Sequence, residues 1–249
     1  MPPSFRPARA AAIGLLVVLL SPGCSTPDPA PAHADVLIIG GAVFDGSDSP
    51  GQTADIAIGG DRIIEVGPGL EGRYRAGRTV DARGLVVAPG FIDPHTHPST
   101  YIRSPEPEVR RNLPWLHQGV STIFIGIDGG GTPDVAEQAD WFRTHGVGTN
   151  FAAYVGLGPV RRRVLGDAAR APDADELAAM RGMVAAAMCQ GAIGFSTGLF
   201  YAPQSFATTD EVVALAEEAA VRGGVYDTHH RDESSYSIGL MGSIEEVLE

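Results

Sequence analysis

The sequence predicts an α/β fold: a (β/α)8 TIM barrel, truncated after about five β/α units, that follows a small N-terminal β-sandwich module. Three observations predict it. In residues 35–88, Gly, Asp and Pro separate short apolar runs, which is typical of short strands. After residue 88, strand-like runs alternate with helical segments, and this indicates parallel strands joined by crossovers. A complete barrel takes about 250 residues, and residues 89–249 are far fewer.

Five apolar runs in residues 89–249 are predicted to be the strands of the barrel: VVAPGFID, VSTIFIG, TNFAAYVG, GAIGFSTG and GVYDTHH. Helical segments are expected near residues 106–118, 133–144, 173–189 and 208–222. Three helix starts have the spacing of a capping box, and these are Asp173 with Glu176, Thr208 with Glu211, and Ser243 with Glu246.

Residues 1–23 have the pattern of a signal peptide. Arg6 and Arg9 precede an apolar run, AAIGLLVVLL, that is too short to span a bilayer. The residues before Cys24 resemble a bacterial lipobox, so we expect an exported protein, periplasmic or held at the cell envelope by lipidated Cys24. The alternative is ordinary signal cleavage nearby, with Cys24 an incidental thiol. Residues 24–34 are predicted to be a flexible tether.

Composition and charge exclude several classes of protein. The chain is 44% hydrophobic and 19% charged, as in globular proteins. A net charge of -12 makes nucleic acid an unsuitable partner. The only two cysteines, Cys24 and Cys189, exclude disulfide-rich scaffolds and cysteine-rich zinc sites. Any metal ion must therefore be held by histidine and carboxylate side chains.

Other conspicuous residues are interpreted as structural. Cys189 closes an apolar helix and is predicted to be a small core residue. Trp115, Trp141 and Met188 fall on apolar helix faces and are also predicted to be core. The basic run of residues 161–163 is expected in a solvated loop, with contact to an anionic substrate as a weaker alternative.

His95 and His97 form the strongest chemical signal. They follow a strand-like run, and at a period of two residues both side chains point the same way. Two imidazoles at the carboxyl end of a barrel strand can bind one cation, and barrel active sites lie at that end. Asp128 follows the next strand and precedes three glycines, which allow close approach of the backbone to a ligand. Its carboxylate is a candidate ligand, and an Asx-turn residue is the structural alternative.

The fifth strand ends in a third cluster of candidate residues, YDTHHRDE. Strand alternation places Asp227 and His229 on one side and His230 on the other. Periodicity alone does not choose between the two histidines as a metal ligand. Arg231 is a candidate for binding a substrate carboxylate, with pairing to Asp232 or Glu233 as the structural alternative.

The whole pattern resembles the amidohydrolase superfamily, and within it the N-acyl-D-amino-acid deacylase (D-aminoacylase) family. The segments that carry the resemblance are GGAVFDG, ADIAIGGDRIIEVG, GFIDPHTH, GVSTIFIGIDG, GAIGFSTGLFYAP and YDTHHRDE. They cover roughly residues 34–249. The resemblance implies a metal-dependent hydrolase barrel over residues 89–249 and a urease-alpha-like composite β module over residues 35–88.

The resemblance also implies roles for individual residues. His95 and His97 would bind Zn²⁺, as one or two ions, and His229 would bind at the second position. Asp128 stands where the family has a bridging cysteine, a change that zinc tolerates. Tyr201 would hold the substrate or the reacting carbonyl. Leu157 stands where relatives often have histidine, which leaves the contribution of the third strand open.

The implied reaction is zinc-dependent hydrolysis of the amide bond of a small N-acyl-D-amino acid. The family's proton-transferring aspartate lies beyond Glu249, so we expect the isolated 249-residue chain to be inactive. Alternatives are another amidohydrolase, of the dihydroorotase or isoaspartyl dipeptidase kind, or an inactive fragment that binds a metal. A carboxylated lysine in the fourth strand would favour the first alternative, and GAIGFSTG contains none. The sequence does not indicate an oligomeric state.

Overall fold

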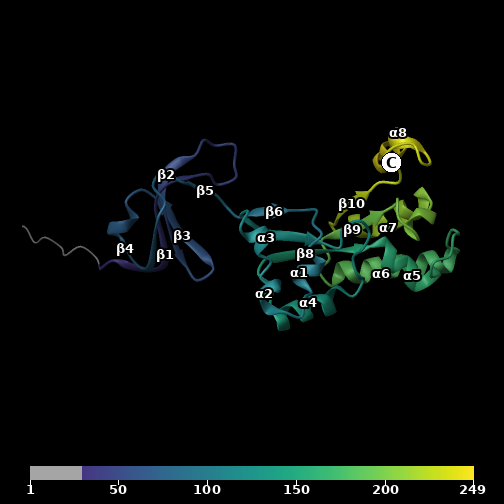
Figure 1. The fold of residues 1–249 in the computed structure, drawn as a ribbon, viewed down its shortest axis with the longest axis horizontal. Coiled ribbons are helices and arrows are strands. Elements are labelled where there is room, and N and C mark those ends of the chain that lie inside the picture. The colour runs from purple at the N-terminus through teal and green to yellow at the C-terminus, as the bar shows by residue number, and fades with distance from the viewer. Residues whose placement is uncertain (1–29) are drawn as a thin grey trace, which may run out of the picture. The chain divides into compact units, whose positions relative to one another are not determined.

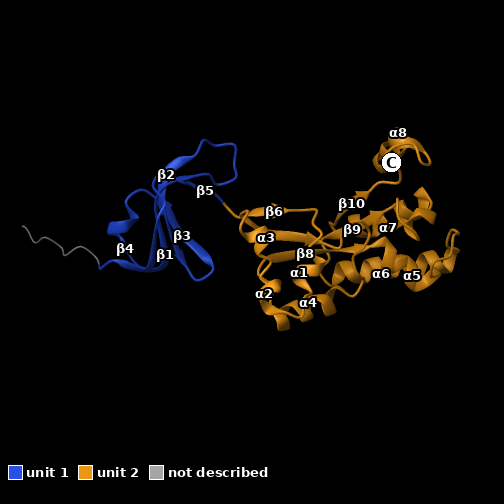
Figure 2. Ribbon diagram, viewed as in Figure 1, with its two compact units in different colours: residues 1–88 blue, residues 89–249 orange. Residues whose placement is uncertain are grey.

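The computed structural model describes residues 30–249, which form two compact units that meet at the Ala88–Pro89 bond (Figure 2). The predicted signal peptide and Cys24 lie outside the described residues. Among residues 30–249, no helix is long and apolar enough to cross a membrane.

The first unit is one mixed sheet of five strands, β1 (Ala32–Val43), β2 (Gln52–Gly59), β3 (Arg62–Gly67), β4 (Tyr74–Asp81) and β5 (Val86–Val87). A sandwich was predicted, but the strands lie in a single sheet. β1 joins them, because it pairs antiparallel with β2 and parallel with both β4 and β5. A short 3-10 helix, η1 (Leu70–Gly72), adds Leu70 to a small core. β1 begins inside the segment predicted to be a tether.

The second unit contains five parallel strands in consecutive order, which is the arrangement predicted for a partial barrel (Figure 1). They are β6 (Phe91–Asp93), β7 (Val120–Ile125), β8 (Asn150–Gly156), β9 (Gly194–Gly198) and β10 (Val225–His229). β6 and β10 form the two edges of this sheet, and side chains from their carboxyl ends nevertheless touch. The sheet is therefore curled like half of a barrel.

Helices connect these strands. They are α1 (Ser99–Ile102), α2 (Pro107–Arg110), α3 (Leu113–Leu116), α4 (Val135–His145), α5 (Leu157–Leu165), α6 (Ala174–Cys189), η2 (Gln204–Phe206), α7 (Thr209–Ala220) and α8 (Gly239–Leu248). The predicted helix over residues 106–118 is interrupted, because Asn112 has a left-handed conformation (φ 53°) and Pro114 follows it. Helix α5 was not predicted at all.

The predicted capping boxes have three different outcomes. Asp173 and Glu176 form a complete box at the start of α6. At α7, Thr208 accepts from the backbone N–H of Glu211, whereas the Glu211 side chain is paired elsewhere. Ser243 does not begin a helix, because α8 starts at Gly239, and the buried Ser243 hydroxyl bonds to His230 and to the N–H of Asp232.

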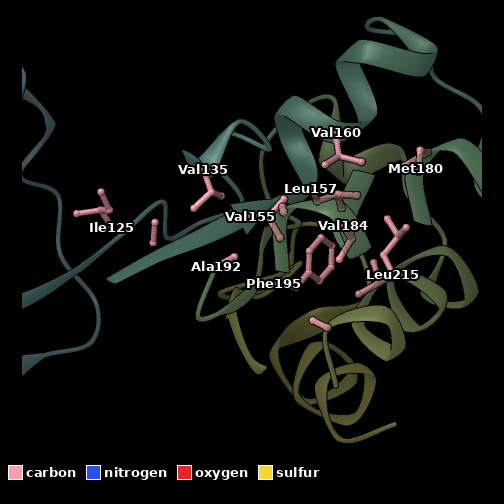
Figure 3. Close-up of a cluster of buried hydrophobic side chains, with 14 of the residues drawn as sticks. Ile125, Val135, Val155, Leu157, Val160, Met180, Val184, Ala192, Phe195 and Leu215 are labelled. Atoms are coloured by element: carbon pink, nitrogen blue, oxygen red, sulfur yellow. The ribbon is translucent and has the colours of Figure 1, made fainter. Parts of the chain in front are cut away.

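The main core lies between the sheet and helices α4 to α7 (Figure 3). Trp115, Trp141 and Met188 pack against it, as predicted. Cys189, predicted to be core, is exposed. The buried stripe of α6 is formed by Met180, Val184 and Ala187, and the helical period carries Cys189 off that face.

The prediction of a loop at residues 161–163 is also wrong, because these arginines are part of α5, although Arg162 and Arg163 are exposed as predicted. Arg161 falls on the buried face between Leu157 and Leu165 and is fully buried. It donates from Nη1 to both carboxylate oxygens of Glu211 on α7, at 2.5 and 2.6 Å. A buried arginine is tolerated here because a buried carboxylate neutralises it.

Candidate metal centre

The side chains of His95 and His97 lie on the same side of the loop that follows β6. Thr96, between them, is buried, and its hydroxyl donates to the carbonyl of Phe124 on β7 at 2.6 Å. The alternation of side chains then turns His95 and His97 the other way. Their ring centroids are 5.7 Å apart. The two imidazoles point the same way, as predicted, although both residues follow strand β6 instead of lying within it.

Asp128, from the loop after β7, meets both histidines. Its Oδ2 lies 2.9 Å from Nε2 of His97, and its Oδ1 lies 3.3 Å from Nε2 of His95. One ligand atom from each of the three side chains lies within 4.8 Å of the others. Oδ1 of Asp128 is buried and accepts no hydrogen bond. A buried carboxylate oxygen without a donor is costly in the absence of a cation.

The backbone around Asp128 is held by residues of the next strand and its loop. Asp128 itself has φ 55°, a left-handed conformation that aspartate tolerates better than most residues. Ser196 on β9 accepts from the Gly129 N–H at 3.1 Å and donates to the Gly126 carbonyl at 2.5 Å. Buried Gln204 donates to the carbonyl of Asp128 at 3.0 Å and accepts from Gly198 N–H at 2.8 Å.

The glycines after Asp128 serve packing within the protein. A Cβ on Gly129 would lie 1.8 Å from the side-chain oxygen of Gln204, and one on Gly131 would lie 2.0 Å from the carbonyl of Tyr154. The sequence suggested that these glycines allow close approach to a ligand. In the structure they allow close approach of the Asp128 loop to β8 and to Gln204.

The two histidines at the carboxyl end of β10, His229 and His230, have different neighbours. Periodicity alone left open which of them is the candidate metal ligand. Thr228 and Tyr226 both hydrogen-bond to Thr197, on the helix-covered side of the sheet. Asp227 is on the opposite side, where its Oδ1 lies 3.0 Å from Nδ1 of His95. His229 lies two residues after Asp227 on the same strand, so its side chain points to the same side of the sheet.

His230 has a different neighbour, and its Nδ1 lies 2.8 Å from the hydroxyl of Ser243 on α8. Nε2 of His229 lies 3.0 Å from Oε1 of Glu233 but makes no hydrogen bond. His229 does not join the group of three ligand atoms formed by His95, His97 and Asp128.

Tyr201, after β9, lies beside His229, with ring centroids 4.7 Å apart. Burial first, and then the charges of Asp128 and Glu233, raise the pKa of the Tyr201 phenol above its usual value. The phenol therefore keeps its proton at neutral pH and can donate a hydrogen bond. Tyr201 is 45% exposed, so a ligand can reach it.

The remaining candidates have other partners. Arg231 donates to both carboxylate oxygens of Glu246 on α8 and to the carbonyl of Ser205. Its partner is therefore neither Asp232 nor Glu233, and the guanidinium is engaged by α8. Leu157 is fully buried in the main core, so the third strand contributes no polar side chain at that position.

Sequence reasoning named Asp227 as a candidate but missed its contact with His95, and it missed two further residues that shape this centre. The contact between Asp227 and His95 joins residues 132 positions apart. Strand parity did place Asp227 on the side of His229, which was the available signal. Ser196 and Gln204, which hold the Asp128 loop, carried no recognisable signal in the sequence.

The donor set fits zinc, which binds two histidines and a carboxylate in many hydrolytic sites. Within residues 30–249, three buried side-chain atoms of the candidate residues and Asp227 make no hydrogen bond: Oδ1 of Asp128, Oδ2 of Asp227 and Nε2 of His229. Carboxylate oxygens and the lone pair of an imidazole nitrogen without a hydrogen-bond donor suit a cation. The chain contains no lysine anywhere, as all 18 basic residues are arginine, so none of its residues can become a carboxylated lysine.

No family model matches the chain. Among curated proteins, D-aminoacylase of Alcaligenes xylosoxydans xylosoxydans is 37% identical over 231 residues, 83% of this chain and 46% of that protein. N-acyl-D-aspartate deacylase of the same organism is 36% identical over 246 residues, 87% of this chain and 47% of that protein. The chain is homologous to the N-acyl-D-amino-acid deacylases. It spans about half the length of the curated relatives it matches.

Solved structures of D-aminoacylases and deacylases have the same fold. A crystal structure of D-aminoacylase, described as defining a novel subset of amidohydrolases, superposes with a TM-score of 0.75 at 34% identity. The superposition covers 86% of this chain and 48% of the D-aminoacylase chain. N-acyl-D-glutamate deacylase of Bordetella bronchiseptica was solved with zinc and a phosphonate inhibitor. It superposes with a TM-score of 0.78 at 32% identity, and the superposition covers 87% of this chain and 48% of the deacylase chain. The predicted barrel class and the predicted resemblance are therefore confirmed.

Proposed function

We propose that this protein is a zinc-dependent hydrolase that releases D-amino acids from N-acyl-D-amino acids. The observation that carries the proposal is the meeting of His95, His97 and Asp128 around a buried carboxylate oxygen that no donor satisfies. Homology to the D-aminoacylases supports the choice of substrate, since their named substrates are N-acyl-D-amino acids.

The three side chains would hold one zinc ion, and His229 is the candidate for a second. Zinc supplies two kinds of chemistry at such a site, polarisation of an amide carbonyl and a lowered pKa, about 7, for a water molecule. The D-aminoacylase relative is described as having a binuclear metal centre with one-metal activation and second-metal attenuation. One tightly held ion at His95, His97 and Asp128 is therefore the arrangement we propose for catalysis.

Tyr201 is proposed to donate a hydrogen bond to the oxygen of the scissile carbonyl. Its protonated phenol and its place beside His229 suit that role. Removing one such donor from an oxyanion site typically costs about 2.7–4 kcal/mol of transition-state stabilisation. Arg231 remains a proposal as a contact for the substrate carboxylate, and it would have to leave Glu246 to make one.

The test is hydrolysis by the protein purified with all of the polypeptide that its gene encodes and loaded with zinc. N-acetyl-D-amino acids and their L enantiomers are offered, and the free amino acid is measured. We expect release from the D substrates, loss of release with a chelator, and recovery on adding zinc.

His97→Ala should abolish release from the D substrates, and His117→Ala, which removes an exposed histidine after α3, should leave it unchanged. Absence of release from every N-acyl-D-amino acid, or release that survives removal of the metal, would overturn the proposal.

We also propose that the protein is exported and anchored to the cell envelope through a lipid on Cys24. The support is the signal-like residues 1–23 and the small residues before Cys24. Growth of a bacterial host with labelled palmitate should label the protein, and Cys24→Ala should remove the label. Cys189→Ala is the matched control and should keep it. Equal labelling of the two variants would refute lipidation at Cys24.

A further inference from the structure

Asp227 is the acidic residue on the inner side of β10, and it reaches across to the histidine pair. β10 and β6 are opposite edges of the sheet. The distance from Oδ1 of Asp227 to Nδ1 of His95 is nevertheless 3.0 Å. This contact joins the last strand of the half-barrel to the loop that carries the proposed zinc ligands.

His95 uses its two ring nitrogens in different directions. Nδ1 faces Asp227, and Nε2 faces Oδ1 of Asp128 at 3.3 Å. A neutral imidazole has one N–H and one lone pair. A carboxylate accepts hydrogen bonds only, so it favours the tautomer in which Nδ1 carries the proton. That tautomer presents the lone pair of Nε2 to the space shared with Asp128 and His97.

The Asp227 carboxylate has no other hydrogen-bond partner among the described residues. Its Oδ2 is buried without a donor, and the side chain is 16% exposed. No arginine pairs with it within residues 30–249. The only polar contact of the Asp227 side chain among the described residues is therefore the one with His95, a proposed zinc ligand.

We propose that Asp227 is a positioning residue that fixes His95 as the Nδ1–H tautomer, with Nε2 as the metal-binding nitrogen. The inference rests on the zinc site of the proposed function. Hydrogen-bonded carboxylates behind a ligating histidine set its tautomer and raise its basicity, and their removal typically lowers metal affinity about 10- to 100-fold. Asp227 acts through His95 and is not itself counted as a ligand.

The test measures zinc affinity by competition with a chromophoric chelator, on the 249-residue chain. We expect Asp227→Ala to weaken zinc binding about 10- to 100-fold. Asp227→Asn keeps an oxygen acceptor for Nδ1–H without the charge, and it should give an intermediate affinity. Asp175→Asn removes an exposed carboxylate at the start of α6 and should leave the affinity unchanged.

A second readout follows the tautomer directly. In the metal-free chain, nitrogen-15 NMR of the imidazoles, assigned with His95→Gln, should show the proton of His95 on Nδ1. In Asp227→Ala it should move towards Nε2, the usual preference of a free imidazole. A merely structural role for Asp227 would change the melting temperature without this shift.

The outcomes separate the two proposals. If the wild-type chain does not bind zinc, the metal site itself fails. If it binds zinc and Asp227→Ala binds equally well, the inference about Asp227 is wrong while the site stands. Weakened binding with an unchanged His95 tautomer would also overturn it, because Asp227 would then act on the ion and not through His95.

Discussion

The position of Asp128 depends on residues that never touch a metal ion. This left-handed residue, at φ 55°, lies between Gly126 and Gly129, which both hydrogen-bond to Ser196, and its own carbonyl accepts from Gln204. Gln204 is buried, and its amide links the Asp128 carbonyl to the Gly198 N–H at the end of β9. The geometry of the proposed ligand is therefore set by hydrogen bonds between loops.

Replacing Gln204 with leucine should loosen Asp128. The variant keeps the volume of the side chain and removes both hydrogen bonds. It leaves the part-buried carbonyl of Asp128 and the buried N–H of Gly198 unpaired, and the buried group alone costs about 1–3 kcal/mol of folding free energy. We expect zinc affinity to fall by about 10-fold, at the low end for a residue that orients a ligand.

Gln190→Leu is the control for this change, because Gln190 also accepts from a backbone N–H, that of Ala136, but outside the metal centre. Chelator competition on both variants provides the comparison. Equal zinc affinities for Gln204→Leu and the wild-type chain would mean that the Asp128 loop holds its shape unaided.

At the scale of single residues, the sequence predicted what short-range geometry determines. The common direction of His95 and His97 follows from strand alternation, and the parity of Asp227 and His229 does too. The pairing of Asp227 with His95 depends on the curl of the whole sheet, which no local pattern encodes. Arg161 was misplaced for a similar reason, since its partner Glu211 lies 50 residues away.

Among the elements, helix α6 depends on a charge at its start. Glu176 completes the capping box with Asp173 and also pairs with Arg170 through two hydrogen bonds of 2.6 Å. The hydrogen bonds from Arg170, followed by that from the Asp173 backbone N–H, lower the pKa of Glu176 from 4.5 to about 2. The folded state thus favours the ionised carboxylate.

This shift in the pKa of Glu176 predicts a pH dependence of stability. Because the folded pKa is the lower one, the contribution of Glu176 is complete above about pH 4.5 and is lost as the pH falls towards about 2. Glu176→Gln keeps a capping amide and removes the charge. Its melting temperature should lie below that of the wild-type chain at pH 7, and the difference should shrink between pH 4.5 and pH 3.

The Arg170→Gln background serves as the control for Glu176. With Arg170 absent, adding Glu176→Gln should change the melting temperature less, and with a weaker dependence on pH. A difference between Glu176→Gln and the wild-type chain that stays constant from pH 7 to pH 3 would contradict the assigned cause.

Helices α5 and α7 are joined by the buried Arg161–Glu211 pair, whose side chains are 0% and 1% exposed. Removing one partner leaves an uncompensated buried charge, so Glu211→Gln should lower the free energy of unfolding by about 3–5 kcal/mol. Replacing both partners, as Arg161→Met with Glu211→Leu, should cost much less, because no buried charge remains. Denaturant unfolding measures both.

Asp140→Asn provides the comparison at the surface, where Asp140 pairs with Arg143 in an exposed i,i+3 contact. It should cost less than about 1 kcal/mol. A Glu211→Gln variant as stable as Asp140→Asn would show that the buried pair does not hold α5 against α7.

Helix boundaries were predicted less well than helix existence. The capping box of α6 is local and was correct. Helix α5 was missed because its arginine run suggested solvent, and only the tertiary contact with Glu211 on α7 explains the burial of Arg161. The N-cap of α8 was predicted at Ser243, whereas it is Ile238, since the hydroxyl of Ser243 interacts with His230 and with the N–H of Asp232 instead of capping a helix.

For the whole molecule, the alternation of strands and helices was enough to predict five parallel strands in consecutive order. Periodicity does not reveal how far the sheet curls. Curling is what brings Asp227 on β10 to His95 after β6, whereas His95, His97 and Asp128 come from the loops after two paired strands, β6 and β7. The similarity to D-aminoacylase structures extends over this arrangement.

The central claim is that His95, His97 and Asp128 form a zinc site. The most direct test is the zinc affinity of the 249-residue chain, measured by competition with a chromophoric chelator. We expect tight binding by the wild-type chain, a loss of at least about 100-fold in His97→Ala, since that change removes a ligand and not merely a group behind one, and no change in His117→Ala. Equal affinities in His97→Ala and the wild-type chain, or no zinc binding by any of them, would contradict the claim.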